Sequence, residues 1–231
     1  DTVPLGAAML MKVYPQQVLA YEADSLLMAD GTRIVYDDGK QKDFVTMLDH
    51  SDPEDMFTMA YDTTAWQPAY LSDAGRSRCE ELFKSMYGHS EAEARQKLVR
   101  VEWFGQQLPF TSVNGAADSL RAVARHMQRH PEYVKYMKQA STFYWRAVRG
   151  AQRQSAHCYG IAIDVNTSLS NYWLWSNPGA GELDDGLKYE NRVPREVVRI
   201  FEQHGFIWGG RWYHYDTMHF EFRPEFIGHQ P

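Results

Sequence analysis

Apolar and polar residues alternate in the first part of the chain with the two-residue period of a half-buried β-strand. Two such runs, 25–28 and 32–36, flank Asp30-Gly31, and Asp38-Gly39 follows the second run. Asp-Gly between alternating apolar residues is a strong hairpin signal. The pattern therefore predicts two strands joined by a tight turn, with a buried face made by Leu26, Met28, Ile34 and Tyr36.

Helical signals follow this hairpin. Pro53, with acidic residues around it, is typical of a first helical turn. Residues 73–87 are helical by composition and Gly88 is a natural stop. Ser90-Glu-Ala-Glu93 fits a capping box that opens another helix. We therefore interpret residues 1–95 as an N-terminal region of hairpins and helices whose role the sequence leaves open.

The second half of the chain mixes both periods. Residues 99–103 and 142–148 read as strands, and Asn114 is a plausible N-cap for a helix that runs to about residue 129. Pro131 and Pro194 each open a further helix, and Gly205 ends the second of these.

Two short runs in this half place polar side chains on apolar strands. In residues 161–165, Asp164 and Ala162 share one face, opposite Ile161, Ile163 and Val165. In residues 218–222, His219 and Glu221 alternate with apolar residues. A buried Asp is costly unless something pairs with it, and a metal would do so. Strand and helix signals thus occur along the whole chain, which favours the α+β fold class.

Composition limits the partners. The chain of 231 residues has a net charge of −6 and no concentrated Lys/Arg surface, which argues against nucleic acid. Its length allows one large domain or a catalytic domain with a smaller companion. The pattern that begins near residue 95 favours the second, with the catalytic domain at 96–231 and the companion at 1–95. No run of about 18 apolar residues is present, so we expect no transmembrane segment. The start at Asp1 is not an intact signal peptide. Cys79 and Cys158 are too few for a disulfide scaffold, and whether they are bridged stays open.

Two motifs supply the candidate chemistry. Ser155-Ala-His-Cys-Tyr-Gly-Ile-Ala-Ile-Asp164 contains His157 and Asp164, and Asp216-Thr-Met-His219 contains a further acid and histidine. Together they offer a metal two imidazoles and a carboxylate, with a spare carboxylate nearby. A hydrolytic zinc site needs three protein ligands, an open position and a base. The acids at 37–55 do not match an EF-hand loop, so we read them as solvated turns and helix starts.

The pattern Ser-x-His-x-x-Gly-x-Ala-x-Asp, followed by acid-x-x-His, resembles the VanY-type D-alanyl-D-alanine carboxypeptidase family, which has the hedgehog/DD-peptidase fold. The resemblance implies an α+β fold with a small antiparallel sheet that carries a zinc site and helices packed on the sheet, in addition to the N-terminal hairpin and helical region. This family also contains phage and bacterial L-alanyl-D-glutamate endopeptidases. The flanking segments Phe143-Tyr-Trp-Arg146, Phe201-Glu-Gln-His-Gly-Phe-Ile-Trp-Gly-Gly210 and Met218-His-Phe-Glu-Phe-Arg-Pro-Glu225 strengthen the resemblance, which extends over about residues 96–231.

The resemblance implies a zinc metallopeptidase that cuts the stem peptides of peptidoglycan, as a carboxypeptidase or an endopeptidase. It implies one Zn²⁺ per chain, held by His157, Asp164 and His219, with Asp216 as the general base and acid. It also implies an arginine upstream of the first histidine that stabilises the oxyanion, and we favour Arg146 for this role over Arg153.

Three further residues are candidates for substrate contact: Ser155, Arg153 and His214. His214 is close to the second motif in the sequence. Its side chain could therefore hydrogen-bond to a metal ligand rather than contact the substrate. The aromatic and glycine-rich stretch 172–192 either bounds the substrate cleft or packs in the core.

An alternative interpretation is a zinc-stabilised binding module without catalysis, similar to the signalling domain of hedgehog proteins. Asp216 and the upstream arginines speak for an enzyme. An exported location, in the periplasm or cell envelope, follows only from the implied substrate. The bond that is cut and the oligomeric state remain open.

Overall fold

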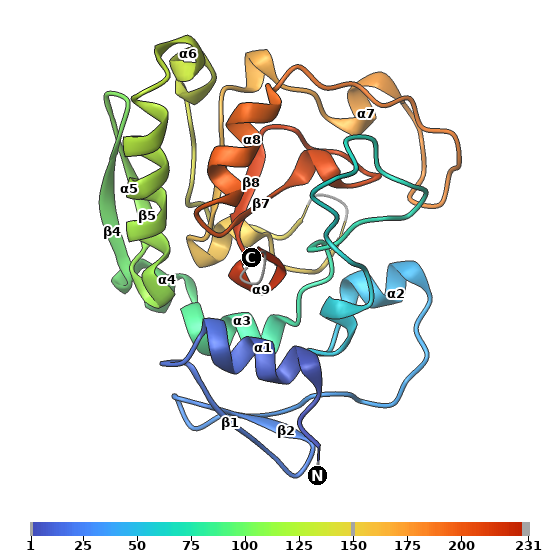
Figure 1. Cartoon of the computed structure of the whole chain (residues 1–231). Coiled ribbons are helices and arrows are strands. Elements are labelled where there is room, and N and C mark those ends of the chain that lie inside the picture. Colours follow the sequence, from blue (N-terminus) through green and yellow to red (C-terminus); the bar gives the residue numbers. More distant parts are fainter. Residues whose placement is uncertain (1, 149–150, 228–231) are drawn as a thin grey trace.

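The computed structural model describes residues 2–148 and 151–227 and has an α+β architecture with small antiparallel sheets, as the sequence predicted (Figure 1). The strands are β1 (Val18–Glu22), β2 (Ser25–Met28), β3 (Arg33–Val35), β4 (Leu98–Trp103), β5 (Gln106–Thr111), β6 (Ala162–Asp164), β7 (Phe206–Trp208) and β8 (His219–Phe222). They form one sheet with the order β1-β2-β3, the hairpin β4-β5 and a sheet with the order β6-β8-β7. All the strand pairs are antiparallel.

The α-helices are α1 (Leu5–Val13), α2 (Phe44–Asp49), α3 (Glu80–Tyr87), α4 (Glu91–Gln96), α5 (Ala116–Met127), α6 (Val134–Met137), α7 (Trp173–Ser176), α8 (Arg195–Glu202) and α9 (Pro224–Ile227). Short 3₁₀ turns are η1 (Asp55–Phe57), η2 (Val113–Gly115), η3 (Pro131–Tyr133), η4 (Ala156–Tyr159), η5 (Thr167–Leu169) and η6 (Gly209–Arg211). In the part of the chain that the structure describes, no helix has the length and apolar character needed to cross a membrane.

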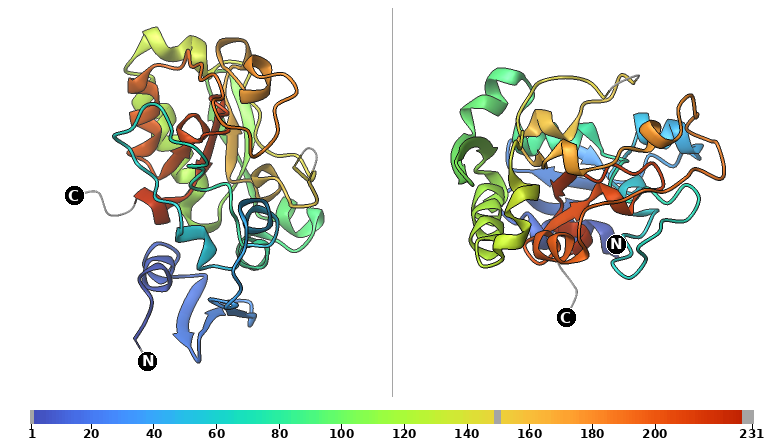
Figure 2. Two further views of the ribbon diagram at one scale, coloured as in Figure 1. Left: turned by 90° about the vertical axis from the view of Figure 1, so that its right-hand side faces the viewer. Right: turned by 90° about the horizontal axis from the view of Figure 1, so that it is seen from above.

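The elements are arranged around the sheet β6-β8-β7. Helix α5 lies along the hairpin β4-β5 on one side, whereas α1 and the sheet β1-β2-β3 lie at the opposite end from α7 (Figure 1). The two turned views show the long segment 177–192 beside residues 58–72 (Figure 2). The hydroxyl of Tyr70 donates a hydrogen bond to the carbonyl oxygen of Leu183 at 2.7 Å, which joins these two segments.

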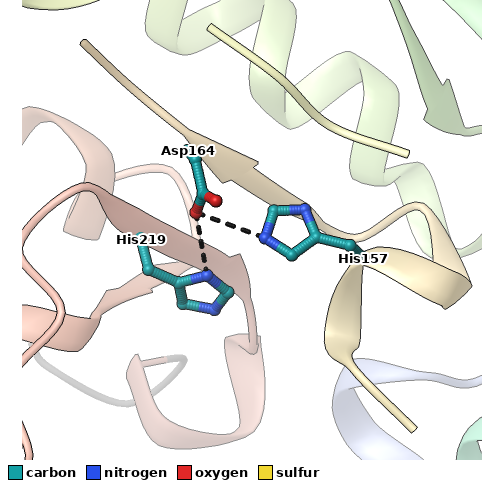
Figure 3. A group of neighbouring side chains, drawn as sticks. All are labelled: His157, Asp164 and His219. Carbon is teal, nitrogen blue, oxygen red and sulfur yellow. Dashed lines mark hydrogen bonds and ion pairs between the residues drawn. The ribbon is translucent and has the colours of Figure 1, made fainter. Parts of the chain in front are cut away.

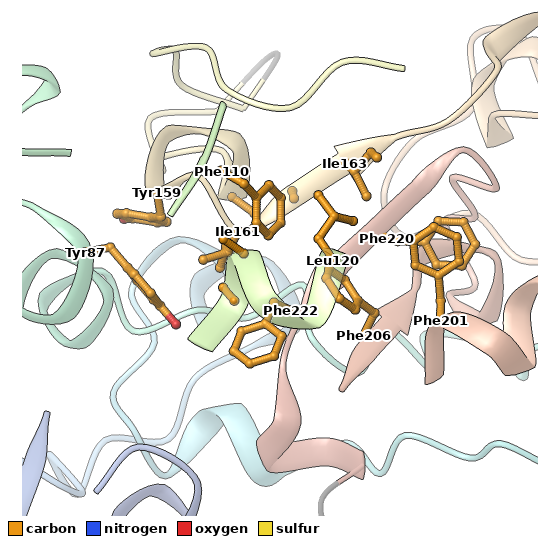
Figure 4. Packing of buried hydrophobic residues seen from close by; sticks show 14 of the residues in the cluster. Tyr87, Phe110, Leu120, Tyr159, Ile161, Ile163, Phe201, Phe206, Phe220 and Phe222 are labelled. Carbon is orange, nitrogen blue, oxygen red and sulfur yellow. The ribbon is translucent and has the colours of Figure 1, made fainter. Parts of the chain in front are cut away.

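One hydrophobic core joins the N-terminal and C-terminal parts. Phe201 of α8 stacks on Phe220 of β8 with ring centroids 3.8 Å apart (Figure 4). The ring of Tyr159 contacts both Phe83 and Tyr87 of α3, at 5.6 and 6.3 Å. These aromatic pairs bury large apolar areas, which is the main source of stability in such a domain. Side chains from both sides of residue 95 lie in this core. The domain boundary near residue 95 stays a prediction.

Several predicted elements are confirmed. The hairpin 25–36 forms as β2 and β3, and the run 99–103 forms β4. The hydroxyl of Ser90 caps α4 by accepting from the backbone N–H of Glu93. Pro194 precedes α8, and Gly205 follows that helix with a φ of +88°, a conformation that glycine adopts without strain.

The predicted helix 73–87 is wrong in its first half, because α3 begins only at Glu80. Gly75 has a φ of +101°, which is incompatible with a helix, and its carbonyl oxygen accepts a hydrogen bond from Arg223. Asp73 and Arg78 are held by partners elsewhere in the fold. Tertiary contacts thus outweigh the helical composition of this segment.

The predicted strand 142–148 is also wrong. The backbone here makes only isolated bridges, Ser141 with Asp164 and Ala147 with Gln154. It bends around the first motif, because the backbone N–H of Arg146 bonds to the sulfur of Cys158. No neighbouring strand runs beside it over several residues, so a continuous ladder does not form.

Two predicted helix starts differ in detail. Gly115, not Asn114, is the N-cap residue of α5. Asn114 lies one residue earlier in η2 with a φ of +58°, and its side chain donates to the hydroxyl of Tyr87. After Pro53 the chain makes only the 3₁₀ turn η1. There the carboxylates of Asp52 and Asp55 each accept from the other's backbone N–H, which closes a compact turn.

Candidate metal centre

Two adjacent strands and one turn bring the motif residues together. Asp164 ends β6 and His219 begins β8, and the two are directly opposite in the strand register. The side chains of directly opposed residues in an antiparallel pair project on the same face, with their Cβ atoms about 4.5–5.5 Å apart. His157 lies in η4, and Gly160, with a φ of +69°, turns the chain from η4 into β6. Figure 3 shows the three side chains converging from these elements.

The distances between the three side chains suit a metal ion. Oδ1 of Asp164 lies 3.2 Å from Nε2 of His157 and 3.2 Å from Nδ1 of His219. One ligand atom from each residue lies within 4.8 Å of the others. Two atoms bound at ~2.0–2.1 Å to a tetrahedral zinc would be ~3.3 Å apart. The donor set of two imidazoles and one carboxylate therefore fits zinc in both chemistry and spacing.

The other nitrogen of each histidine ring has a polar partner. Nδ1 of His157 lies 2.5 Å from the carbonyl oxygen of Thr142. Nε2 of His219 lies 2.8 Å from Oε1 of Glu221, two residues further along the same strand. Such partners fix the orientation of a ligating ring.

Asp216 lines the same cavity as the three ligand candidates, and one of its carboxylate oxygens is unpaired in the described chain. Its Oδ1 is buried and has no hydrogen-bond partner among the described residues. Burial, together with the nearby Asp164 carboxylate, raises the pKa of Asp216 to about 7. A buried and unpaired carboxylate oxygen is costly, and a nearby cation would offset that cost.

Neighbouring carboxylates raise the pKa of His219. Burial alone would lower its pKa, but hydrogen bonds to Asp164 and Glu221 raise the pKa to about 10. For Asp164, burial acts to raise the pKa, but the neighbouring His157 and His219 lower it. The pKa of Glu221 is also held well below its usual value, since Arg78 outweighs the effect of burial. Metal-free protein thus keeps these two carboxylates ionised around a protonated imidazole.

The three ligand candidates and Asp216 line one cavity of about 290 Å³. Four arginines also line it: Arg76, Arg78, Arg146 and Arg153. Arg76 pairs with Asp73 at 2.7 Å and with Glu182 at 2.9 Å. The cavity is therefore the place where the chain gathers metal-ligating, acidic and cationic groups.

Arg146 differs from the other three arginines. Its NH2 lies 3.2 Å from the hydroxyl of Tyr144, and its guanidinium lies over the Tyr144 ring, 4.7 Å from the centroid. Within residues 2–148 and 151–227 it has no carboxylate partner. Arg153, in contrast, is bound to Asp49. Arg146 is therefore the one arginine lining the cavity that has no acidic partner in the described part of the chain.

Each residue that the sequence predicted for substrate contact lines this cavity. The hydroxyl of Ser155 accepts from the backbone N–H of His157 at 3.4 Å and so caps η4. His214 lies between Asp73, 2.5 Å from Nδ1, and the carbonyl oxygen of Glu182, 2.9 Å from Nε2. It holds two neighbouring segments together and is not among the grouped ligand atoms.

The sequence left open whether the aromatic stretch 172–192 bounds the cleft or packs in the core. The start of this stretch does both. Trp173 is buried, whereas 55% of the surface of Trp175 is exposed, and both line the cavity together with Tyr172. Trp175 and Tyr172 contact each other edge to face at 6.1 Å. The start of this stretch therefore forms an aromatic wall of the cavity.

The sequence interpretation missed Tyr144. Its ring stacks on the ring of His157 at 4.4 Å, and its hydroxyl lies 3.4 Å from Oδ2 of Asp164. A signal was present, because Tyr144 and Arg146 have the i, i+2 spacing that places them on one side of an extended segment. Arg76 and Arg78 gave no such signal, since they are far from both motifs in the sequence.

The two cysteines and the acidic residues 37–55 are not among the residues that line the cavity. Cys79 and Cys158 are free thiols. The Nζ of Lys42 lies 3.2 to 3.4 Å from Asp38 and Asp52 and 2.5 Å from Asp55. One lysine ammonium thus pairs with three of these acids and offsets part of their charge.

Comparison with known proteins gave one match. Residues 149–222 match a family model described as D-alanyl-D-alanine carboxypeptidase. The matched segment contains His157, Asp164, Asp216 and His219. No curated protein and no solved structure matches this chain. The resemblance predicted from the two motifs is thus confirmed, because residues 149–222 are similar to this family of peptidases.

Proposed function

We propose that this protein is a zinc-dependent peptidase that hydrolyses stem peptides of peptidoglycan, as a D-Ala-D-Ala carboxypeptidase or an L-Ala-D-Glu endopeptidase. The observation that carries the proposal is the cavity in which His157, Asp164 and His219 converge beside the unpaired Oδ1 of Asp216. The family match over residues 149–222 supports the reaction class and the substrate class.

One Zn²⁺ per chain would be held by His157, Asp164 and His219. When bound, zinc supplies a Lewis acid and lowers the pKa of water to about 7, so that a nucleophile is available at neutral pH. The residues of the chain supply the remaining functions.

Asp216 is the general base and acid of this proposal. A catalytic base works best when its pKa lies near the operating pH, and the burial that raises the pKa of Asp216 moves it in that direction. Its carboxylate accepts the proton of the attacking water and then delivers it to the nitrogen of the leaving amine. The free Oδ1 is available for this transfer because no described side chain occupies it.

Arg146 is the proposed partner of the negative charge that develops on the carbonyl oxygen. Its lack of an acidic partner leaves the full guanidinium charge for the substrate, which favours the transition state. Ser155, Arg153 and His214 are proposed substrate contacts at the cavity wall. A peptidoglycan substrate further implies an exported protein of the periplasm or cell envelope.

The proposal is tested by digestion of purified muropeptides, with the products identified by mass spectrometry. Wild-type protein with zinc is expected to release one defined peptide product, and a chelator is expected to abolish the release. Asp216→Asn keeps the shape of the side chain but removes the base, so kcat should fall by at least about 10²-fold while zinc is retained.

Asp118→Asn is the matched control, because Asp118 is exposed on α5 and, among the described residues, its carboxylate pairs with Arg121 alone. This variant is expected to cleave at the wild-type rate. Wild-type protein that binds zinc stoichiometrically but cleaves no muropeptide would overturn the peptidase proposal in favour of a zinc-stabilised binding module. Full activity of Asp216→Asn would remove Asp216 from its assigned role.

A further inference from the structure

A buried ion-pair network lies directly behind one ligand of the candidate metal centre. Glu221 is two residues beyond His219 in β8, so both side chains project from the same face of the strand. Both Glu221 and its partner Arg223 are fully buried. The Nε and NH2 groups of Arg78 donate to the two oxygens of Glu221, each at 2.8 Å. NH1 of Arg223 donates to Oε2 at 2.9 Å.

These contacts leave Glu221 only one possible role. Oε2 accepts from Arg78 and Arg223, and Oε1 accepts from Arg78 and faces Nε2 of His219 at 2.8 Å. Both oxygens of this carboxylate accept hydrogen bonds from guanidinium groups, which can only donate, so the remaining site on Oε1 is a lone pair that also accepts. Nε2 of His219 must therefore carry a hydrogen, and only Nδ1 retains a lone pair for a metal.

The geometry of the other nitrogen agrees with this assignment. Nδ1 of His219 lies 3.2 Å from Oδ1 of Asp164, on the side where the ligand atoms gather. His157 is set in the opposite sense, because its Nδ1 faces the Thr142 carbonyl, which is also an obligate acceptor. The two histidines therefore present different nitrogens, Nε2 of His157 and Nδ1 of His219.

Arg78 comes from the N-terminal part of the chain, far from both motifs. Its segment is joined to the end of β8 at a second point, because NH1 of Arg223 donates to the carbonyl oxygen of Gly75 at 2.9 Å. A carboxylate that is held by the two-pronged contact of Arg78 and by a further hydrogen bond from Arg223 keeps a fixed position.

On the basis of the proposed function, we propose that Arg78 and Glu221 are positioning residues that hold His219 with its hydrogen on Nε2 and present Nδ1 to the zinc. The region before residue 95 thereby takes part in metal binding without providing a ligand. Substitution of residues that orient a ligating histidine typically weakens metal affinity by about 10- to 100-fold.

The first test uses wild-type protein with ¹⁵N-labelled histidine and ¹¹³Cd²⁺ as the metal. We expect scalar coupling from cadmium to Nδ1 of one histidine and Nε2 of another, with the Nε2 hydrogen of the first retained. Loss of the Nδ1 coupling in His219→Gln assigns that signal. Coupling of His219 through Nε2 in the wild type would overturn the inference, whatever the variants do.

The second test measures the zinc dissociation constant by competition with a chelator for Glu221→Gln and Arg78→Met. Both are expected to bind zinc about 10- to 100-fold more weakly and to melt cooperatively. Arg121→Met is the control, because this exposed arginine on α5 pairs with Asp118 away from the cavity. It should bind zinc as the wild type does.

The outcomes separate the two proposals. Zinc affinities of both variants within about twofold of wild type would overturn the positioning role and leave the peptidase proposal intact. Wild-type protein that takes up neither zinc nor cadmium would overturn the proposed function and, with it, this inference. Weaker binding in both variants, with Nδ1 coupling in the wild type, supports the inference.

Discussion

The centre of the cavity concentrates opposite charges on few side chains. Asp164, Asp216 and Glu221 face two imidazoles and the guanidinium of Arg78. In metal-free protein these side chains offer more hydrogen-bond acceptors than donors, since Oδ1 of Asp216 has no hydrogen-bond partner in the described chain. Protons and a metal ion therefore compete for the same atoms, which makes both stability and metal affinity depend on pH.

The metal-free protein is expected to lose stability as the pH rises from about 6.5 to 9. The pKa of His219 is raised to about 10 in the folded state, so the folded protein holds a proton that the unfolded chain releases above about 6.5. The stabilisation is fully present below the unfolded pKa and is lost towards the folded pKa. One such proton corresponds to a slope of up to about 1.4 kcal/mol per pH unit.

Urea denaturation in the presence of a chelator at several pH values measures this slope. His219→Gln should show a flatter dependence, because glutamine does not titrate. Zinc should stabilise the wild type more at high pH, since its ligand must lose the Nδ1 proton. A metal-free stability that rises between pH 6.5 and 9 would contradict the expected protonation of His219.

At the scale of elements, the turn between η4 and β6 sets the spacing of two ligand candidates. Gly160 has a φ of +69° and closes η4 by donating to the carbonyl oxygen of His157. A Cβ at this position would lie 2.6 Å from Cδ2 of Leu98 and 3.2 Å from the backbone nitrogen of Thr111. The turn therefore needs glycine for both its conformation and its close packing.

Gly160→Ala is expected to lower the free energy of unfolding by more than the about 1–2 kcal/mol that a left-handed conformation costs, and to weaken zinc binding. Gly186→Ala is the matched control, because Gly186 also has a positive φ but nothing lies within 4 Å of an added Cβ. Urea denaturation of both variants separates crowding from conformation. Equal destabilisation of the two would show that the contact with Leu98 is unimportant.

Among the helices and strands, the predictions from the sequence were correct where the signals are local. The β2-β3 hairpin and the runs of β6 and β8 were predicted because alternation and turn residues are local signals. The residues of the candidate centre followed from two compact motifs. The segments 73–79 and 142–148 were misread, because Gly75 bonds to Arg223 and Arg146 to Cys158 across the fold. Arg78 was out of reach for the same reason, since its partner Glu221 is 143 positions away.

At the scale of the whole molecule, the N-terminal part is inseparable from the environment of the site. Phe83 and Tyr87 pack on Tyr159, two residues from His157, and Tyr14 hydrogen-bonds to Glu225. Arg78 adds the contact to Glu221. Removing these residues would expose the core and leave buried charges without partners, both of which strongly destabilise a fold.

A fragment of residues 96–231 is therefore expected not to fold on its own. The fragment should lack a cooperative thermal transition by circular dichroism and should bind zinc far more weakly than the full chain, which is the reference. A fragment that melts cooperatively and retains wild-type zinc affinity would instead support an independent catalytic domain with its boundary near residue 95.

The strand order of the sheet β6-β8-β7 also has a consequence for the order of events at synthesis. The central strand, β8, is the latest of the described strands to leave a ribosome or a translocation channel, because chains are made from the N-terminus. Until it arrives, β6 and β7 have no partner between them, and Asp164 has neither Asp216 nor His219 beside it. The nascent chain thus stays without its candidate metal centre until almost the whole described chain has emerged, so that the sheet and the centre assemble together.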